Sequence, residues 1–221
     1  GRIFSDPGYH VQIGRFDIPF GLDYLLYATP DRPTVTPPLS TELMFEGGWT
    51  DNGIRVLKAH PVFNTTLYVV NGFDEGYAVG GRIGLRPFEN PFSSHTIRVS
   101  PLLEIGVSGA LDMDKKSNRQ LTIAGADLEM NIPAGRVLAE YMMGRNHDTC
   151  TDQKSWYLMT ILPGRMIGMD FVSRYEEHRN DIPEESDDLI SRVTFGLSKK
   201  LFEITSIKAE YIRYKIGRAH V

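Results

Sequence analysis

Residues 97–111 have the sequence IRVSPLLEIGVSGAL, and this stretch decides the fold class. Apolar residues such as Ile105 and Val107 alternate there with small or polar residues such as Ser108. A period of two residues is typical of a β-strand with one apolar face and one face in water. Strands of soluble domains usually have about 5–6 residues, whereas a tilted strand needs about 9–11 residues to cross a bilayer. Residues 97–111 are therefore enough for one strand to cross a bilayer.

The same alternation recurs along most of the chain. We predict about eleven strands, at residues 9–18, 53–59, 63–70, 79–86, 97–111, 124–132, 136–144, 155–162, 167–176, 191–198 and 204–214. Between them we find no segment with the 3.6-residue period of an amphipathic helix. The sequence therefore predicts an all-β fold, an up-and-down antiparallel transmembrane β-barrel.

The connections between the predicted strands largely alternate between long and short. Short turns are predicted at residues 60–62 and 163–164, and longer connections at residues 19–52, 145–154 and 177–187. In an antiparallel sheet the longer connections then lie at one end, as they do in outer-membrane barrels. We therefore predict a location in the bacterial outer membrane, with outer-membrane lipid and lipopolysaccharide as partners.

The composition of the chain argues against several classes of protein. The chain has 221 residues and a net charge of −4, which argues against a nucleic-acid partner. It has no apolar run of about 18 residues, so a transmembrane helix is not expected, while a β-barrel needs no such run. Cys150 is the single cysteine, so no internal disulfide can form. We expect no metal site and no cofactor.

Both ends of the chain carry a prediction. Since no charged and apolar leader pattern precedes the first predicted strand, we expect no signal peptide in residues 1–8. Residues 216–221, with the sequence IGRAHV, match the translation of a common sequencing adapter, so we expect them not to be native. Outer-membrane barrels normally have an even number of strands, whereas we predict about eleven here. We therefore expect residues 1–215 to be a single β-barrel domain that is a fragment of a larger barrel.

Short motifs resemble those of the phosphate-selective porins of the O and P type. The motifs follow in the order that such porins show: GRF at 14–16, PFG at 19–21, GWTDNG at 48–53, VNG at 70–72, GGR at 80–82 and Pro87. The resemblance covers residues 11–175. It implies a homotrimeric barrel of about sixteen strands that passes small anions. The predicted strands are too few to close such a barrel.

If the apolar face of each strand meets lipid, the other face lines the lumen, where charges are tolerated. The candidate pore-lining residues are the charged residues of that face, namely Arg55, Arg82, Arg86, Arg98, Glu104, Asp127, Glu129, Arg136, Glu140, Asp170, Arg174, Arg192 and Lys208. Two interpretations stay open: cross-strand ion pairs that stiffen the wall, and a basic ladder that guides anions. Because the two signs nearly cancel, we expect at most a weak anion preference.

The proline-rich segment 19–52 is a second candidate. Its five prolines exclude a continuous strand or helix. A loop of this length is usually functional or disordered. It could fold into the lumen and narrow it, with Asp31 and Arg32 at its tip, or it could cover the barrel from outside and contact a neighbouring subunit.

The sequence is compatible with three classes of function. The first is an outer-membrane porin for passive diffusion of small hydrophilic solutes or ions. The second is a soluble, lipid-binding or structural barrel, which would have an apolar interior and a polar exterior. The third is an outer-membrane barrel enzyme. Since no histidine shares a strand face with a serine as a dyad would require, the sequence predicts a porin and no enzyme.

Overall fold

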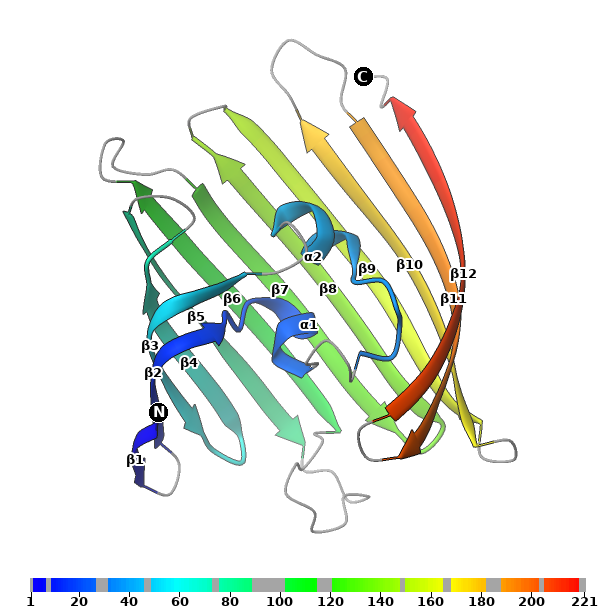
Figure 1. Ribbon diagram of the computed structural model, residues 1–221, viewed down its shortest axis with the longest axis horizontal. Helices are drawn as coiled ribbons and strands as arrows, with labels where there is room; N and C mark the ends of the chain where they lie inside the picture. Colours follow the sequence, from blue (N-terminus) through cyan, green and yellow to red (C-terminus); the bar gives the residue numbers. More distant parts are fainter. Residues whose placement is uncertain are drawn as a thin grey trace.

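The computed structural model describes most of the chain as one antiparallel sheet. The described residues are 2–6, 9–26, 32–45, 49–72, 76–88, 102–114, 121–147, 150–164, 168–181, 188–202 and 205–218. Within them, twelve strands pair in chain order (Figure 1). The strands are β1 (Arg2–Asp6), β2 (Tyr9–Asp17), β3 (Thr50–Ala59), β4 (Phe63–Val70), β5 (Gly76–Phe88), β6 (Leu103–Asp114), β7 (Leu121–Ile132), β8 (Gly135–Asn146), β9 (Thr151–Gly164), β10 (Met169–Asp181), β11 (Asp188–Phe202) and β12 (Thr205–Arg218). The predicted all-β, up-and-down fold is confirmed.

Two details differ from the prediction. Of the strand predicted over 97–111, the described part begins at Leu103 and continues to Asp114, beyond the predicted end, and residues 97–101 lie outside the described residues. Two helices also occur between β2 and β3, namely α1 (Gly21–Leu26) and α2 (Leu39–Met44). Each has six residues, which is too short for a helical period to be recognised in the sequence.

The strands expose one face and bury the other, as their alternation requires. On β6, Ile105 is 47% exposed and Val107 is 57% exposed, whereas Glu104 and Ser108 are 2% and 8% exposed. The apolar side chains therefore cover the convex side of the sheet, and the charged side chains lie on the concave side. This is the reverse of a soluble barrel with an apolar interior, and it matches a wall that meets lipid.

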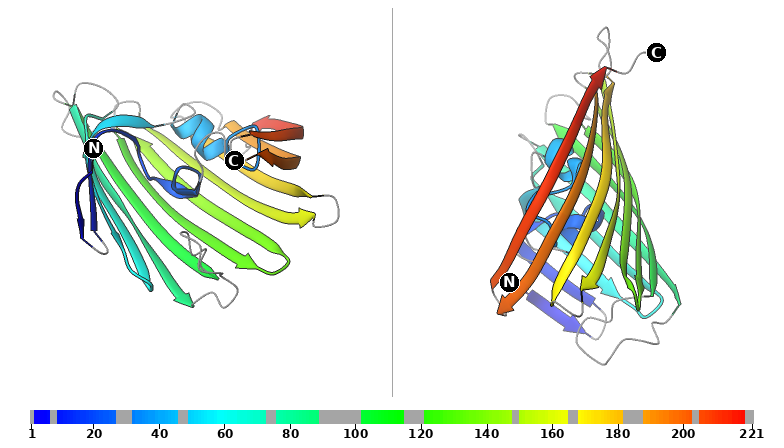
Figure 2. Two further views of the ribbon diagram at one scale, coloured as in Figure 1. Left: turned by 60° about the horizontal axis from the view of Figure 1, so that its bottom comes forward. Right: turned by 90° about the vertical axis from the view of Figure 1, so that its right-hand side faces the viewer.

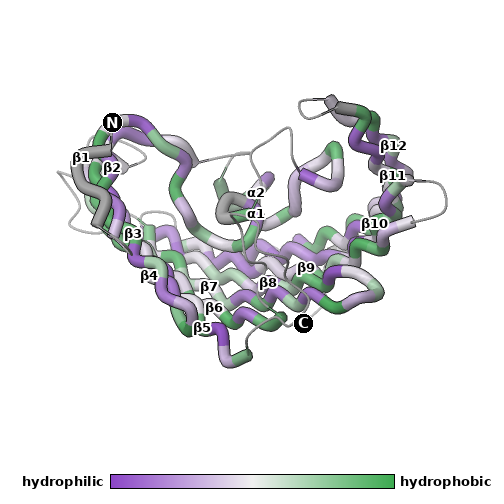
Figure 3. The backbone as a smooth tube through the Cα atoms, turned by 90° about the horizontal axis from the view of Figure 1, so that it is seen from below, coloured by the Kyte–Doolittle hydropathy of each residue, from purple (hydrophilic) through white to green (hydrophobic). Residues whose placement is uncertain are grey.

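The sheet has two distinct ends. The turns 60–62 and 133–134 lie at one end, which we name the short-turn end, at the bottom of Figure 1. β2 runs toward the other end, where β12 finishes. In the described residues β1 and β12 do not pair, so the sheet is open, as Figure 3 shows along the strands. No described helix is long and apolar enough to cross a membrane.

The described part of the connection between β2 and β3, residues 18–26, 32–45 and 49, lies within the concave side of the sheet (Figures 2 and 3). This part is named the inner segment. Pro38 has an extended backbone with φ −57° and ψ 152°, and α2 begins at the next residue. Its carbonyl accepts the Glu42 amide at 2.9 Å, which closes the first helical turn.

Candidate functional site

Aromatic side chains attach the inner segment to the wall. The rings of Phe20 and Phe45 lie 5.5 Å apart, and Phe45 stacks on Trp49 at 6.0 Å. Trp49 meets the ring of Tyr68 on β4 edge-on at 6.2 Å. All four residues are buried, so this stack stabilises the segment by removing aromatic surface from water.

Glu140 on β8 binds the start of both helices. Its carboxylate accepts the backbone N–H of Leu22 at 2.5 Å and the hydroxyl of Ser40 at 2.9 Å. Gly21 precedes this contact with φ +72°, and a Cβ atom there would lie 2.2 Å from Met142 and 2.5 Å from Glu140. Glycine is therefore required at position 21 for both its conformation and its close approach.

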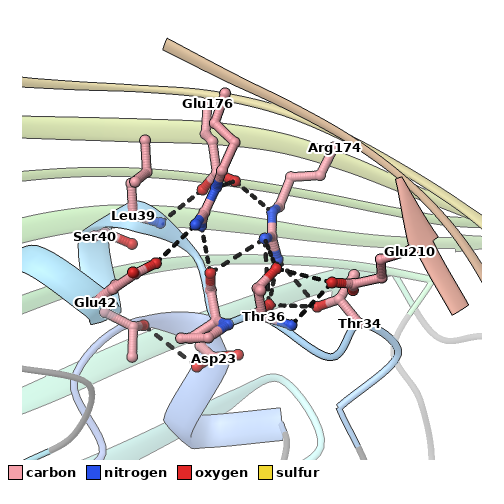
Figure 4. A network of polar contacts seen from close by, with 12 residues as sticks. Asp23, Thr34, Thr36, Leu39, Ser40, Glu42, Arg174, Glu176 and Glu210 are labelled. Atoms are coloured by element: carbon pink, nitrogen blue, oxygen red, sulfur yellow. Dashed lines mark hydrogen bonds and ion pairs between the residues drawn. The ribbon is translucent and has the colours of Figure 1, made fainter. Parts of the chain in front are cut away.

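Two arginines of the wall share one carboxylate. The Nε atoms of Arg174 on β10 and Arg192 on β11 donate to the same Oε1 of Glu176, at 2.8 and 2.7 Å. The other carboxylate oxygen of Glu176 accepts the backbone N–H of Leu39 at 2.6 Å. Arg192 also pairs with Glu42 of α2 at 2.7 Å. The wall and the inner segment thus form one network of charged hydrogen bonds (Figure 4).

The extended part of the inner segment is bound through its backbone. The guanidinium of Arg174 donates to the carbonyl of Thr36 at 3.2 Å, to that of Pro37 at 3.1 Å and to the hydroxyl of Thr34 at 3.0 Å. Glu210 on β12 accepts the N–H of Thr36 at 3.1 Å and its hydroxyl at 3.0 Å (Figure 4). The segment is therefore fixed from two sides.

Arg32 does not extend into open space. It is 6% exposed and forms a two-fold ion pair with Asp23, at 2.6 and 2.7 Å. Asp23 also accepts the hydroxyl of Thr41 at 3.3 Å. Arg32 thus joins two parts of the inner segment, while Asp31, predicted beside it, lies outside the described residues.

A second network lies on β4 to β7 and is named the lower wall cluster, with members Asn64, Arg82, Arg86, Glu104 and Asp127. Arg82 pairs with Asp127 through two bonds of 3.0 and 2.5 Å and with Glu104 at 2.8 Å. Arg86 binds the other oxygen of Glu104 at 2.7 Å. Asn64 donates to Glu104 at 2.9 Å and accepts from Arg82 at 3.0 Å. The predicted cross-strand ion pairs are therefore present.

In two ion pairs toward the short-turn end, the arginine side chain is more exposed than the carboxylate side chain. The side chain of Arg86 is 28% exposed and that of Glu104 is 3% exposed. Arg136 on β8 and Glu129 on β7 pair at 2.8 Å with side-chain exposures of 25% and 3%. At the level of α2 the order is reversed, because Glu42 is 42% exposed and Arg192 is fully covered.

The remaining predicted wall residues are less connected. Arg55 on β3 donates to Gln12 at 2.9 Å, and its guanidinium lies 4.8 Å from the ring centre of Phe16. Lys208 is half-buried, and Asp170 is exposed near the start of β10. Arg98 lies outside the described residues.

Sequence reasoning missed the partners on the inner segment. The Leu39 N–H, the Thr36 backbone and the Glu42 carboxylate meet wall residues more than a hundred positions away. No short-range pattern reports such pairs. The signal that was available is the series of prolines at 30, 33, 37 and 38. Prolines prevent regular helix or sheet pairing, so backbone carbonyls of such a segment stay available to donors from elsewhere in the chain.

Solved structures of outer-membrane proteins match the fold. A loop L8 deletion mutant of OmpT from Vibrio cholerae has a TM-score of 0.67 at 10% identity, covering 96% of this chain and 72% of its own. Outer-membrane-expressed OmpT of the same organism has a TM-score of 0.64 at 11% identity, covering 96% and 68%. In-vitro folded OmpT has a TM-score of 0.61 at 11% identity, covering 95% and 67%.

The comparisons support an outer-membrane β-barrel located in the bacterial outer membrane. No protein-family model and no curated protein matches the chain. At 10–11% identity a structural match shows the fold alone, and it does not single out the phosphate-selective porins. Phosphate selectivity and a trimeric assembly, which the resemblance implies, stay predictions.

The prediction that the chain is not an enzyme must be corrected. The matching structures are OmpT outer-membrane proteins, and their fold does not exclude catalysis. A histidine and a serine also share a face of the sheet, contrary to the prediction, because Ser155 on β9 and His178 on β10 are direct cross-strand partners on the inner face. There the Ser155 hydroxyl contacts the backbone carbonyl of Glu177 at 3.2 Å.

Proposed function

We propose that the chain is part of the wall of an outer-membrane porin, a water-filled channel for passive diffusion of small hydrophilic solutes or ions. One observation carries this proposal: the concave face presents charged side chains from β5 to β12, while the exposed side chains of the convex face are mainly apolar, with charged ones such as Arg145 and Arg213 near the strand ends. Charges on a lipid-facing wall are costly, whereas a polar inner face is typical of a barrel with an aqueous lumen.

A weak anion preference is supported by the side chains that solvent can reach. The side chains of Glu104 and Glu129 are covered, while those of Arg86 and Arg136 remain partly exposed. A solute that enters at the short-turn end would therefore contact the positively charged side chains of Arg86 and Arg136 before any carboxylate. The exposed carboxylate of Glu42 opposes this at the level of α2, so the preference should be small.

The inner segment would set the bore of such a channel. It occupies part of the concave side, and its backbone is bound by Arg174, Glu176 and Glu210. A segment held by buried charged hydrogen bonds keeps its position better than a free loop. This favours the inward-folded interpretation of residues 19–52 over an outward loop.

Planar-bilayer recording tests the proposal. The protein is inserted into a bilayer under a KCl gradient, and the current is measured at fixed voltages. We expect discrete conductance steps and a reversal potential displaced slightly toward the value for chloride. A folded, inserted protein without conductance steps would overturn the proposal.

A further inference from the structure

The outer face of β10, β11 and β12 carries a furrow with two chemically different halves. Its lower half, of about 440 Å³, is lined mainly by apolar and aromatic side chains, including Phe171, Phe195, Leu197, Ala209 and Tyr211. Its upper half, of about 460 Å³, has a mixed lining that includes Leu189 and Val193 together with Tyr175, Glu177, Arg213 and Lys215. The two halves together are named the outer furrow.

The halves are continuous along the strands. Phe195 and Val193 are successive outward residues of β11, and Tyr211 and Arg213 are successive outward residues of β12. Across the strands, Val193 is paired with Arg213, and Phe195 with Tyr211. The furrow therefore changes from apolar to cationic over one step of the alternation, toward the end opposite the short turns.

The upper half has two cations that lack a carboxylate partner. Arg213 and Lys215 are exposed and form no ion pair within the described ranges. Both oxygens of the nearby Glu177 accept from neutral donors, one from the Trp156 indole at 3.2 Å and one from the Tyr175 hydroxyl. With Glu177 counted, the upper half carries a net charge of +1.

We infer that the outer furrow binds an anionic, phosphate-bearing lipid, with its phosphate at Arg213 and Lys215 and an acyl chain along the apolar half. The charge complements such a headgroup. The aromatic side chains Tyr175 and Tyr211 lie between the two halves, where amphipathic rings favour the border of membrane and water. A soluble anion would use only the upper half, and an uncharged lipid only the lower half.

Trp156 provides the readout, because it contacts Glu177 and stacks at 5.4 Å on Tyr175 at the rim of the furrow. The chain has two tryptophans, so Trp49→Phe leaves Trp156 as the single emitter. This variant is reconstituted in phosphatidylcholine vesicles with rising fractions of phosphatidylglycerol brominated near the headgroup end of its chains. Quenching of Trp156 then gives the relative affinity of the two lipids.

We expect phosphatidylglycerol to bind about fivefold more tightly than phosphatidylcholine, the effect of one net charge at a membrane surface. In the same background, Arg213→Gln with Lys215→Gln should abolish the preference. Arg145→Gln is the matched control, since Arg145 is an exposed arginine of β8 away from the furrow, and it should leave the preference unchanged. Equal affinities in the starting protein, or a preference that survives the double substitution, would overturn the inference.

Discussion

Arg82 on β5 reaches across β6 to form a two-fold ion pair with Asp127 on β7, with bonds of 3.0 and 2.5 Å. Gly106 of β6 lies between them. A Cβ atom at this glycine would lie 2.4 Å from both the Arg82 Nη2 and the Asp127 Oδ1 atoms. The ion pair between Arg82 and Asp127 therefore requires a glycine at position 106, where the two side chains meet over β6.

Gly106→Ala should separate Arg82 from Asp127 and lower the free energy of unfolding by about 1–3 kcal/mol, the usual cost of an added methyl group in a packed site. Gly109→Ala is the matched control on the same strand, because a Cβ atom there would meet nothing closer than 4.0 Å. Urea unfolding in lipid vesicles measures both variants. Equal stabilities for the two would show that the pair tolerates the methyl group.

Replacing Arg86 and Arg136 with Gln should move the reversal potential toward the value for potassium, since both cations are partly exposed while their carboxylate partners are covered. Because the double variant removes both partly exposed cations, while Glu104 and Glu129 stay negative, we expect a larger change than from either single variant. Arg145→Gln, on the outer face, should have no effect. An unchanged reversal potential in the double variant would show that these two arginines do not line the conduction path.

Arg174→Lys should loosen the inner segment while keeping the charge. A lysine ammonium cannot reproduce the planar fork that binds Glu176, Thr36 and Pro37 together. Loss of one hydrogen bond to a charged group costs about 1.5–3 kcal/mol, so hydrogen exchange at the Thr36 and Leu39 amides should quicken by about tenfold or more.

Arg213→Lys on the outer face serves as the control for hydrogen exchange, because it makes the same chemical change outside the network. It should leave both amides as protected as in the unaltered protein. If Arg174→Lys also leaves them protected, Glu176 and Glu210 hold the segment without help from the arginine.

The two faces of the wall could be predicted because alternation is a local property. Glu104 and Ile105 are neighbours in sequence, and the period of two residues alone sends one inward and the other outward. The same reasoning placed Arg82, Asp127 and Arg174 on the inner face. The partners of Arg174 on the inner segment could not be predicted, since Arg174 meets Thr36 across 138 positions of sequence.

The inner segment shows the limit of sequence patterns more clearly. Its helices have six residues each, and α2 is bound through Leu39 and Glu42 to wall residues rather than stabilised by its own periodicity. Arg32 looked like a free charge at a loop tip, but Asp23, nine positions earlier, neutralises it. Such pairings depend on the path of the chain inside the sheet.

Shortening the inner segment tests the central claim most directly. Removing residues 32–38 withdraws the part of the chain that Arg174, Arg192 and Glu210 bind, and leaves these side chains in contact with water instead of buried without partners. Single-channel conductance is then compared with that of the unaltered protein in the same bilayer and salt. A channel narrowed by this segment predicts larger conductance steps, and unchanged steps from a folded, inserted variant would contradict it.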